Sequence, residues 1–105
     1  MAETTPTPLD LLVISARGWL RIATDSRDEE IRQVINACLI DLSNGGVVNV
    51  DVEDAIIQQA VKLYLKSQFG YDMNAIKFEA SYEHLKAALA LSGDYNTEEE
   101  NGEAG

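Results

Sequence analysis

The chain has 105 residues, of which 18 are acidic and 8 are basic, so its formal net charge is −10. A hydrophobic content of 46% is enough for one folded domain and excludes collagen-like, coiled-coil and low-complexity classes. Because proteins bind DNA or RNA tightly through a basic surface that releases counterions, this charge argues against a nucleic-acid-binding function.

The cysteine content and the N-terminal sequence predict a reducing, intracellular setting. Cys38 is the single cysteine and cannot form an internal disulfide, and residues 1–8 lack the basic segment and apolar stretch of a secretory signal. The longest apolar runs, such as residues 11–14, are far shorter than the roughly 18 residues that a spanning helix needs. We therefore expect no membrane segment.

The first helix is expected to follow a flexible leader at residues 1–8. Thr7 offers a cap, Pro8 suits the first helical position, and Asp10 places an acid in the first turn. The apolar pattern continues to residue 22 or 23, and its polar stripe is narrow. Such a helix should be buried on more than one side.

The second helix has the clearest pattern of the four. Ser26 and Glu29 have the spacing of a capping box, and apolar residues then recur every three or four positions from Ile31 to Leu42. Residues 43–46 include two glycines that can end a helix, and residues 47–50 are expected to form an extended connector.

The third helix, capped by Asp51 or Asn49 and ending before Gly70, is expected to carry two apolar lines. We assign the first line to the core of the protomer and the second to a neighbouring subunit. The first line comprises Val52, Ile56, Ala60 and Leu63, and the second comprises Ile57, Val61 and Tyr64.

A fourth helix should begin near Asp72 or Asn74 and stop at residues 92–93, with apolar side chains at core spacing from Phe78 to Leu89. The sequence therefore predicts an all-α, compact four-helix domain over residues 9–95. Residues 96–105 follow as an acidic tail, expected to be solvated, that contains four glutamates.

Self-association is expected because the first and third helices carry more apolar surface than one small domain can cover. The predicted subunit contact comprises Leu12, Trp19, Ile57, Val61 and Tyr64.

No pattern of catalytic or metal-ligating residues is found. Asn49, Asp51 and Glu53 alternate like the start of a calcium loop, but the sixth position is Asp54 instead of glycine, and the twelfth lacks glutamate. His84 and Cys38 lie on different faces of different helices, and no phosphate loop or zinc cluster is present. The sequence predicts neither an enzyme nor a cofactor or metal site.

Several segments resemble the small head-tail connector, or adaptor, proteins of tailed bacteriophages. They are residues 19–22 (WLRI) with the acid-rich 28–31 (DEEI), the glycine pair after the second helix, residues 60–64 (AVKLY), residues 69–72 (FGYD), the stretch 78–86, and residues 91–95 (LSGDY). The resemblance covers about residues 9–95 and leaves the acidic tail outside it.

This resemblance implies a virion protein that assembles in the bacterial host cytoplasm and works in the phage neck. It implies a dodecameric ring that docks under the portal protein after DNA packaging, extends the DNA channel and supports the next connector or tail protein. An acidic surface would let DNA pass without specific binding. The resemblance also suggests that the C-terminal part faces the portal, with Leu89, Leu91 and Tyr95 as candidates.

A different class of function stays open. An acidic helical protein can act as a regulator or DNA mimic that binds a protein partner through its acids. Such a protein would not need the wide apolar surfaces, so the oligomeric state with and without portal protein discriminates the two hypotheses.

Overall fold

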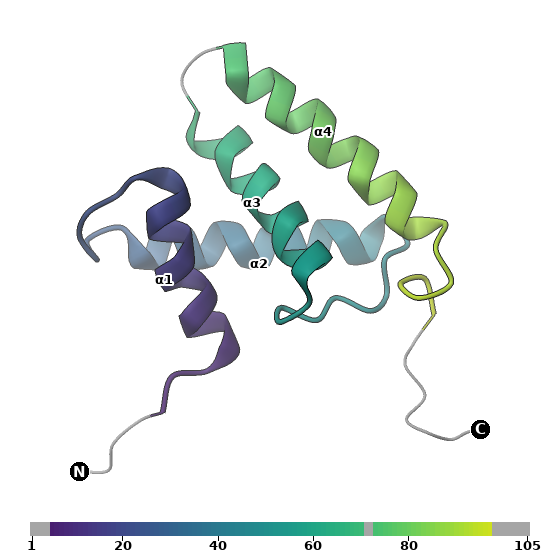
Figure 1. Ribbon diagram of the computed structural model, residues 1–105, viewed down its shortest axis with the longest axis horizontal. Coiled ribbons are helices and arrows are strands. Elements are labelled where there is room, and N and C mark those ends of the chain that lie inside the picture. The colour runs from purple at the N-terminus through teal and green to yellow at the C-terminus, as the bar shows by residue number, and fades with distance from the viewer. Residues whose placement is uncertain (1–4, 71–72, 98–105) are drawn as a thin grey trace.

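The computed structural model describes residues 5–70 and 73–97, and within these ranges the protein is all-helical (Figure 1). It contains α1 (Pro8–Leu20), α2 (Asp28–Asn44), α3 (Ala55–Phe69) and α4 (Met73–Ala90), with no strand in the described ranges. The predicted fold class is confirmed. Half of the predicted leader, residues 1–4, and most of the acidic tail, residues 98–105, lie outside the described residues.

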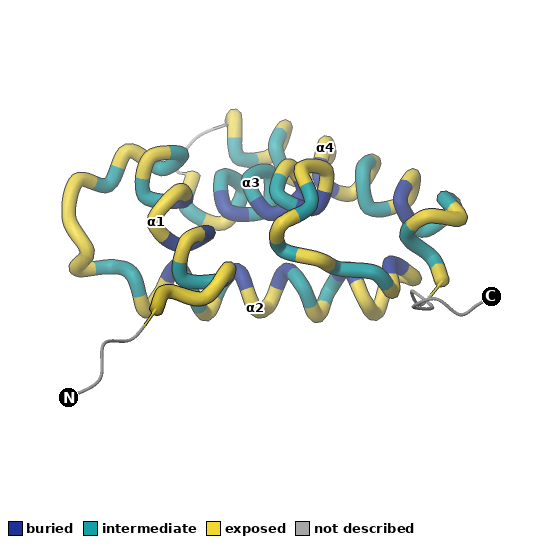
Figure 2. The backbone as a smooth tube through the Cα atoms, turned by 60° about the horizontal axis from the view of Figure 1, so that its bottom comes forward, coloured by how far each residue is buried: buried dark blue, intermediate teal, exposed yellow. Residues whose placement is uncertain are grey.

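The molecule is flat, with principal extents of 46 × 45 × 18 Å. Figure 1 views it down the short axis, with α2 crossing behind α1 and α3. The turned view in Figure 2 shows two layers, α2 in one and α1, α3 and α4 in the other. With only two layers, each helix keeps one side open to the surroundings.

Helix α1 begins as predicted, with Thr7 and Asp10 forming a reciprocal capping box. The Thr7 Oγ1 accepts from the Asp10 amide at 3.1 Å, and an Asp10 carboxylate oxygen accepts from the Thr7 amide at 3.0 Å. The helix ends at Leu20, earlier than predicted, because Arg21 adopts a left-handed conformation with φ of 58°. Its amide bonds back to the Gly18 carbonyl, which terminates the helix.

Helix α2 begins without the predicted capping box. Its first residue is Asp28, and the Ser26 hydroxyl instead forms a hydrogen bond with the Thr24 hydroxyl at 2.9 Å. The predicted C-terminal stop is confirmed: Gly46 has φ of +102°, where a side chain would be strained.

Helix α3 begins later than predicted, and Asp54 caps it rather than Asp51 or Asn49. The Asp54 carboxylate accepts from the Ile56 amide at 3.0 Å and from the Ile57 amide at 3.1 Å. Asp51 instead lies in the turn before the helix, where its backbone carbonyl accepts a hydrogen bond from the Asp54 amide.

Helix α4 begins at Met73, between the two predicted starts, and ends at Ala90, shortly before the predicted stop at residues 92–93.

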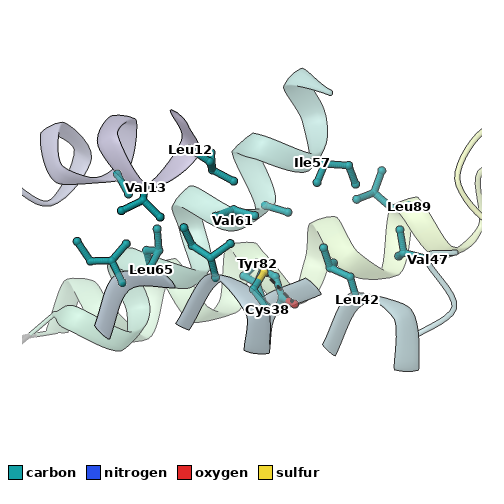
Figure 3. Close-up of a cluster of buried hydrophobic side chains, with 14 residues drawn as sticks. Leu12, Val13, Cys38, Leu42, Val47, Ile57, Val61, Leu65, Tyr82 and Leu89 are labelled. Carbon is teal, nitrogen blue, oxygen red and sulfur yellow. Dashed lines mark hydrogen bonds between the residues drawn. The ribbon is translucent and has the colours of Figure 1, made fainter. Parts of the chain in front are cut away.

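The core lies between the two layers and draws on every helix (Figure 3). Helix α3 is central, because it packs against α1, α2 and α4. The buried side chains are those of Leu12, Val13, Ala16, Ile31, Ile35, Cys38, Leu42, Val47, Ile57, Ala60, Val61, Leu65, Tyr82 and Leu89.

A polar network ties α4 to α2 at the edge of this core. The Tyr82 hydroxyl donates to the Asp41 carboxylate at 2.7 Å, and the Lys86 ammonium binds the same oxygen at 2.8 Å. The hydrogen bond from Lys86 and, to a smaller extent, the one from Tyr82 lower the pKa of Asp41 because they stabilise its ionised form. The Cys38 sulfur lies 3.8 Å from the Tyr82 oxygen. Burial raises the pKa of the Cys38 thiol to about 12.

Two ion pairs hold α1 against α2. The Arg17 guanidinium bonds both carboxylate oxygens of Asp28, with the Nε donor at 2.8 Å, and Arg32 binds Asp10 at 2.9 Å. The two parallel hydrogen bonds fix the orientation of the Arg17 guanidinium and add to the attraction between the two charges.

The turn after α4 folds back onto the start of α3. The Tyr95 carbonyl accepts from the amides of Val48 at 2.8 Å and Asn49 at 3.1 Å, and its hydroxyl donates to Asp54 at 2.9 Å. Asn96 donates through its side chain to the Ala90 carbonyl. This turn anchors the chain up to Asn96 next to the N-terminus of α3.

Candidate assembly surfaces

The predicted subunit contact falls largely inside the protomer. Leu12, Ile57 and Val61 are 2% or less exposed and belong to the core. Trp19 and Tyr64 are half-buried and pack against that core. The Tyr64 ring contacts the Tyr82 ring edge-on, with 4.9 Å between the ring centres. The first three side chains therefore stabilise the protomer itself.

The assignment of faces on α3 is wrong in this respect. Ile57 and Val61 of the second apolar line are buried, whereas Ile56 of the supposed core line is 44% exposed and Leu63 is half-buried. Ala60 is buried as predicted. Both lines are apolar, so only the packing of α3 against the three other helices decides which one turns inward.

The predicted portal-facing residues differ in exposure. Leu89 is buried, Tyr95 is half-buried with its hydroxyl bound to Asp54, and Leu91 is 84% exposed. Of the three, Leu91 offers a free apolar surface.

Other exposed apolar side chains include Ile76 on α4 and two patches that lie one on each layer. The α1 patch comprises Leu11 and Ile14, which are 53% and 50% exposed, and Leu11 borders a shallow pocket of about 130 Å³ between α1 and the start of α3. The α2 patch is centred on Ile40, which is 61% exposed. It lies in an open groove lined by Asn36, Leu39, Ile40, Ser43 and Val50. No charged residue lines that groove, which is the composition expected at the centre of a protein interface.

The outer side of α3 carries a lysine pair that contacts both flanking helices. The Lys62 ammonium lies 5.9 Å from the centre of the Trp19 ring on α1, and the Lys66 ammonium lies 5.4 Å from the centre of the Phe78 ring on α4. Neither lysine forms an ion pair with any described residue. We call this surface the basic face.

Acidic residues gather at the opposite end of α3, near the C-terminal turn. Asp51, Glu53 and Asp94 are exposed and have no ion pair among the residues that the structure describes. The Tyr95–Asp54 hydrogen bond brings the segments of these acids together. We call this surface the acidic end.

The described residues contain no group of three or more side chains that could hold a metal ion. In the same ranges, no helix is long and apolar enough to span a membrane. His84 is exposed on α4, whereas Cys38 is buried under α4. The features that the geometry does provide are apolar and charged surfaces suited to contacts with other proteins.

Comparison with models of protein families identifies a family of proteins that assemble with other proteins. A family model described as "Phage connector protein" matches residues 15–96, which include the C-terminal part of α1 and all of α2, α3 and α4. No curated protein and no solved structure is detectably similar to the chain. Because the family model matches most of the chain, the protein belongs to the phage connector protein family, a family of structural virion components.

Proposed function

We propose that the protein is a subunit of the head-tail connector of a tailed phage. Copies assemble into a ring that docks under the portal after DNA packaging, extends the DNA channel and supports the next connector or tail protein. The family match over residues 15–96 supports the connector role. Ring assembly under the portal and the dodecameric order are parts of the proposal, as is assembly in the host cytoplasm.

The observation that carries the proposal is that the flat protomer exposes apolar surface on both layers. The α1 patch lies on one layer and the α2 patch on the other. A subunit with two different exposed apolar surfaces can contact two partners at once. Head-to-tail contacts of this kind form a closed ring when the rotation between neighbouring copies is a whole fraction of a turn. A regulator or DNA mimic that binds through its acids would need neither patch.

The α1 patch takes the place of the buried residues in the predicted subunit contact. Leu11 and Ile14 lie on the same helix as Leu12 and Trp19 but turn away from the core. We assign the α2 patch and Leu91 to contacts with the portal or with the next protein of the neck. The high negative charge keeps passing DNA from binding the connector.

The test is co-assembly with purified portal protein, observed by negative-stain electron microscopy and by sedimentation. The wild-type protein should form rings that cap the portal. Ile14→Glu and Ile40→Glu should each reduce assembly because a charge would be desolvated at a contact, whereas both proteins should keep wild-type melting curves. His84→Glu, an exposed position on α4, is the matched control and should assemble normally.

Failure of the wild-type protein to associate with portal at any concentration would rule out the connector proposal. Normal assembly of both patch variants would keep the connector role and place the contacts elsewhere on the protomer.

A further inference from the structure

The charges of the protomer are separated along α3. Four of the eight basic residues form ion pairs with carboxylates of the described chain: Arg17, Arg27, Arg32 and Lys86. The basic face, Lys62 and Lys66, has no such partner although acids outnumber bases by 18 to 8. Instead, the aromatic rings of Trp19 and Phe78 hold these two ammonium groups in place.

The acidic end cannot neutralise the basic face within one protomer. Asp54 caps α3, and Lys62 and Lys66 follow it by eight and twelve residues, which corresponds to roughly 12 and 18 Å along a helix. Screening at physiological salt acts over about 8 Å, so the two surfaces interact weakly across that distance. Each surface therefore presents unbalanced charge to the outside.

We propose that a second copy of this chain brings the two surfaces together, with the basic face of one protomer against the acidic end of the next. This inference rests on the proposed function, because it specifies the polar part of the contact between copies. Glu53 and Asp94 would face Lys62 and Lys66 across the boundary, next to Trp19 and Phe78. The contact joins two different surfaces, so it repeats from copy to copy and is compatible with ring closure.

Charge complementarity of this kind governs encounter rate, register and the choice of partner more than total affinity. The apolar patches would supply most of the affinity, and the charges would select orientations in which the basic face of one copy meets the acidic end of another. Orientations that place two basic faces or two acidic ends against each other are disfavoured by repulsion between like charges.

The decisive experiment uses two charge-reversed variants of the full chain. Lys62→Glu/Lys66→Glu makes both surfaces acidic, and Glu53→Lys/Asp94→Lys makes both surfaces basic. Each variant alone should need at least a tenfold higher concentration than wild type to assemble, as measured by sedimentation. An equimolar mixture should recover assembly to within about threefold of wild type, because acidic and basic surfaces alternate again.

Three controls separate this contact from loss of folding and from general repulsion. Circular dichroism melts should show that each variant is folded, with Lys62→Gln/Lys66→Gln as a milder version. Lys77→Glu, which reverses a charge in the same way at an exposed position on α4, should assemble like wild type, in contrast to Lys66→Glu. Carbodiimide, which joins lysines to nearby carboxylates, should link residue 62 or 66 of one wild-type chain to residue 53 or 94 of another.

The proposal is overturned if the mixture assembles no better than its components, or if Lys77→Glu is as defective as Lys66→Glu. It is also overturned if wild-type protein is monomeric at every concentration, or if duplex DNA, and not a second copy, protects Lys62 and Lys66 from an amine-reactive reagent such as acetic anhydride. None of these results would prevent the protein from capping portal particles, so the connector proposal is tested separately.

Discussion

At the scale of single residues, the two sides of α3 differ in how far they are buried. Val61 is fully buried in the protomer, whereas Ile56 on the same helix is 44% exposed. An acidic side chain at position 61 would have to enter the core without a partner, and one at position 56 would remain in solvent.

Val61→Glu is therefore expected to lower the free energy of unfolding by about 4 kcal/mol or more, a large share of the roughly 5–15 kcal/mol that stabilises a typical domain. Ile56→Glu, its matched control, should change stability by less than about 1 kcal/mol. Urea denaturation followed by circular dichroism measures both. Equal stability of the two variants would contradict the burial of Val61.

The ion pairs between α1 and α2 predict how stability depends on pH. The hydrogen bond from Arg17 lowers the pKa of Asp28, and a hydrogen bond from the Thr7 backbone, together with Arg32, lowers that of Asp10. Carboxyl groups with a lowered folded pKa contribute stability above their unfolded pKa, near 3.9, and lose it as the pH falls through the folded pKa.

Stability should therefore be constant near neutral pH and fall below about pH 4. Asp28→Asn should be less stable than wild type at pH 7, and the difference should shrink as the pH falls below the unfolded pKa, because the wild-type carboxyl becomes protonated. Urea midpoints across this pH range test the prediction. A constant difference between the two proteins at all pH values would show that the Asp28 charge is irrelevant.

At the scale of helices, the sequence predicts the existence and order of the elements better than their ends. Thr7 and Asp10 predict the start of α1 correctly because the cap and the acid lie at the required spacing and Pro8 stands at the first helical position. Ser26 has an equally good motif, but its hydroxyl bonds with Thr24. Near α3, three possible caps occur within six residues, and the pattern alone does not identify Asp54 as the one used.

The assembly surfaces were harder to predict than the helices because they depend on which apolar side turns inward. The excess of apolar surface on the first and third helices is visible in the sequence, but Leu11 and Leu12 are adjacent and equally apolar. Only the crossing of α1 over α2 and α3 buries Leu12 and exposes Leu11. Likewise, no sequence pattern shows that Lys62 and Lys66 lie over aromatic rings.

The turn after α4 sets where the C-terminal segment becomes dispensable. Removing residues 98–105 should leave the melting temperature within about 5 °C, because these residues contribute four glutamates and no large apolar side chain. Removing residues 95–105 takes away the Tyr95 and Asn96 hydrogen bonds and should lower it by more than that. Calorimetry of the two truncations provides the comparison, and equal melting temperatures would show that the turn contributes nothing.

At the scale of the whole molecule, the net charge of −10 outweighs the basic face in any encounter with DNA. Two lysines cannot release enough counterions to offset this repulsion. We expect no binding of duplex DNA at micromolar protein and physiological salt, as measured by fluorescence anisotropy of a labelled duplex. Salt-sensitive binding under these conditions would contradict the picture of a channel that DNA crosses without adhesion.

The position of Trp19 gives this protein a built-in optical reporter. It is the single tryptophan, it is half-buried, and its ring lies under Lys62 on the basic face. When a neighbouring copy covers that face, water near the indole is displaced and its emission should shift to shorter wavelength. Dilution of unlabelled protein in a fluorimeter could then follow the joining of subunits, and stopped-flow mixing could time it.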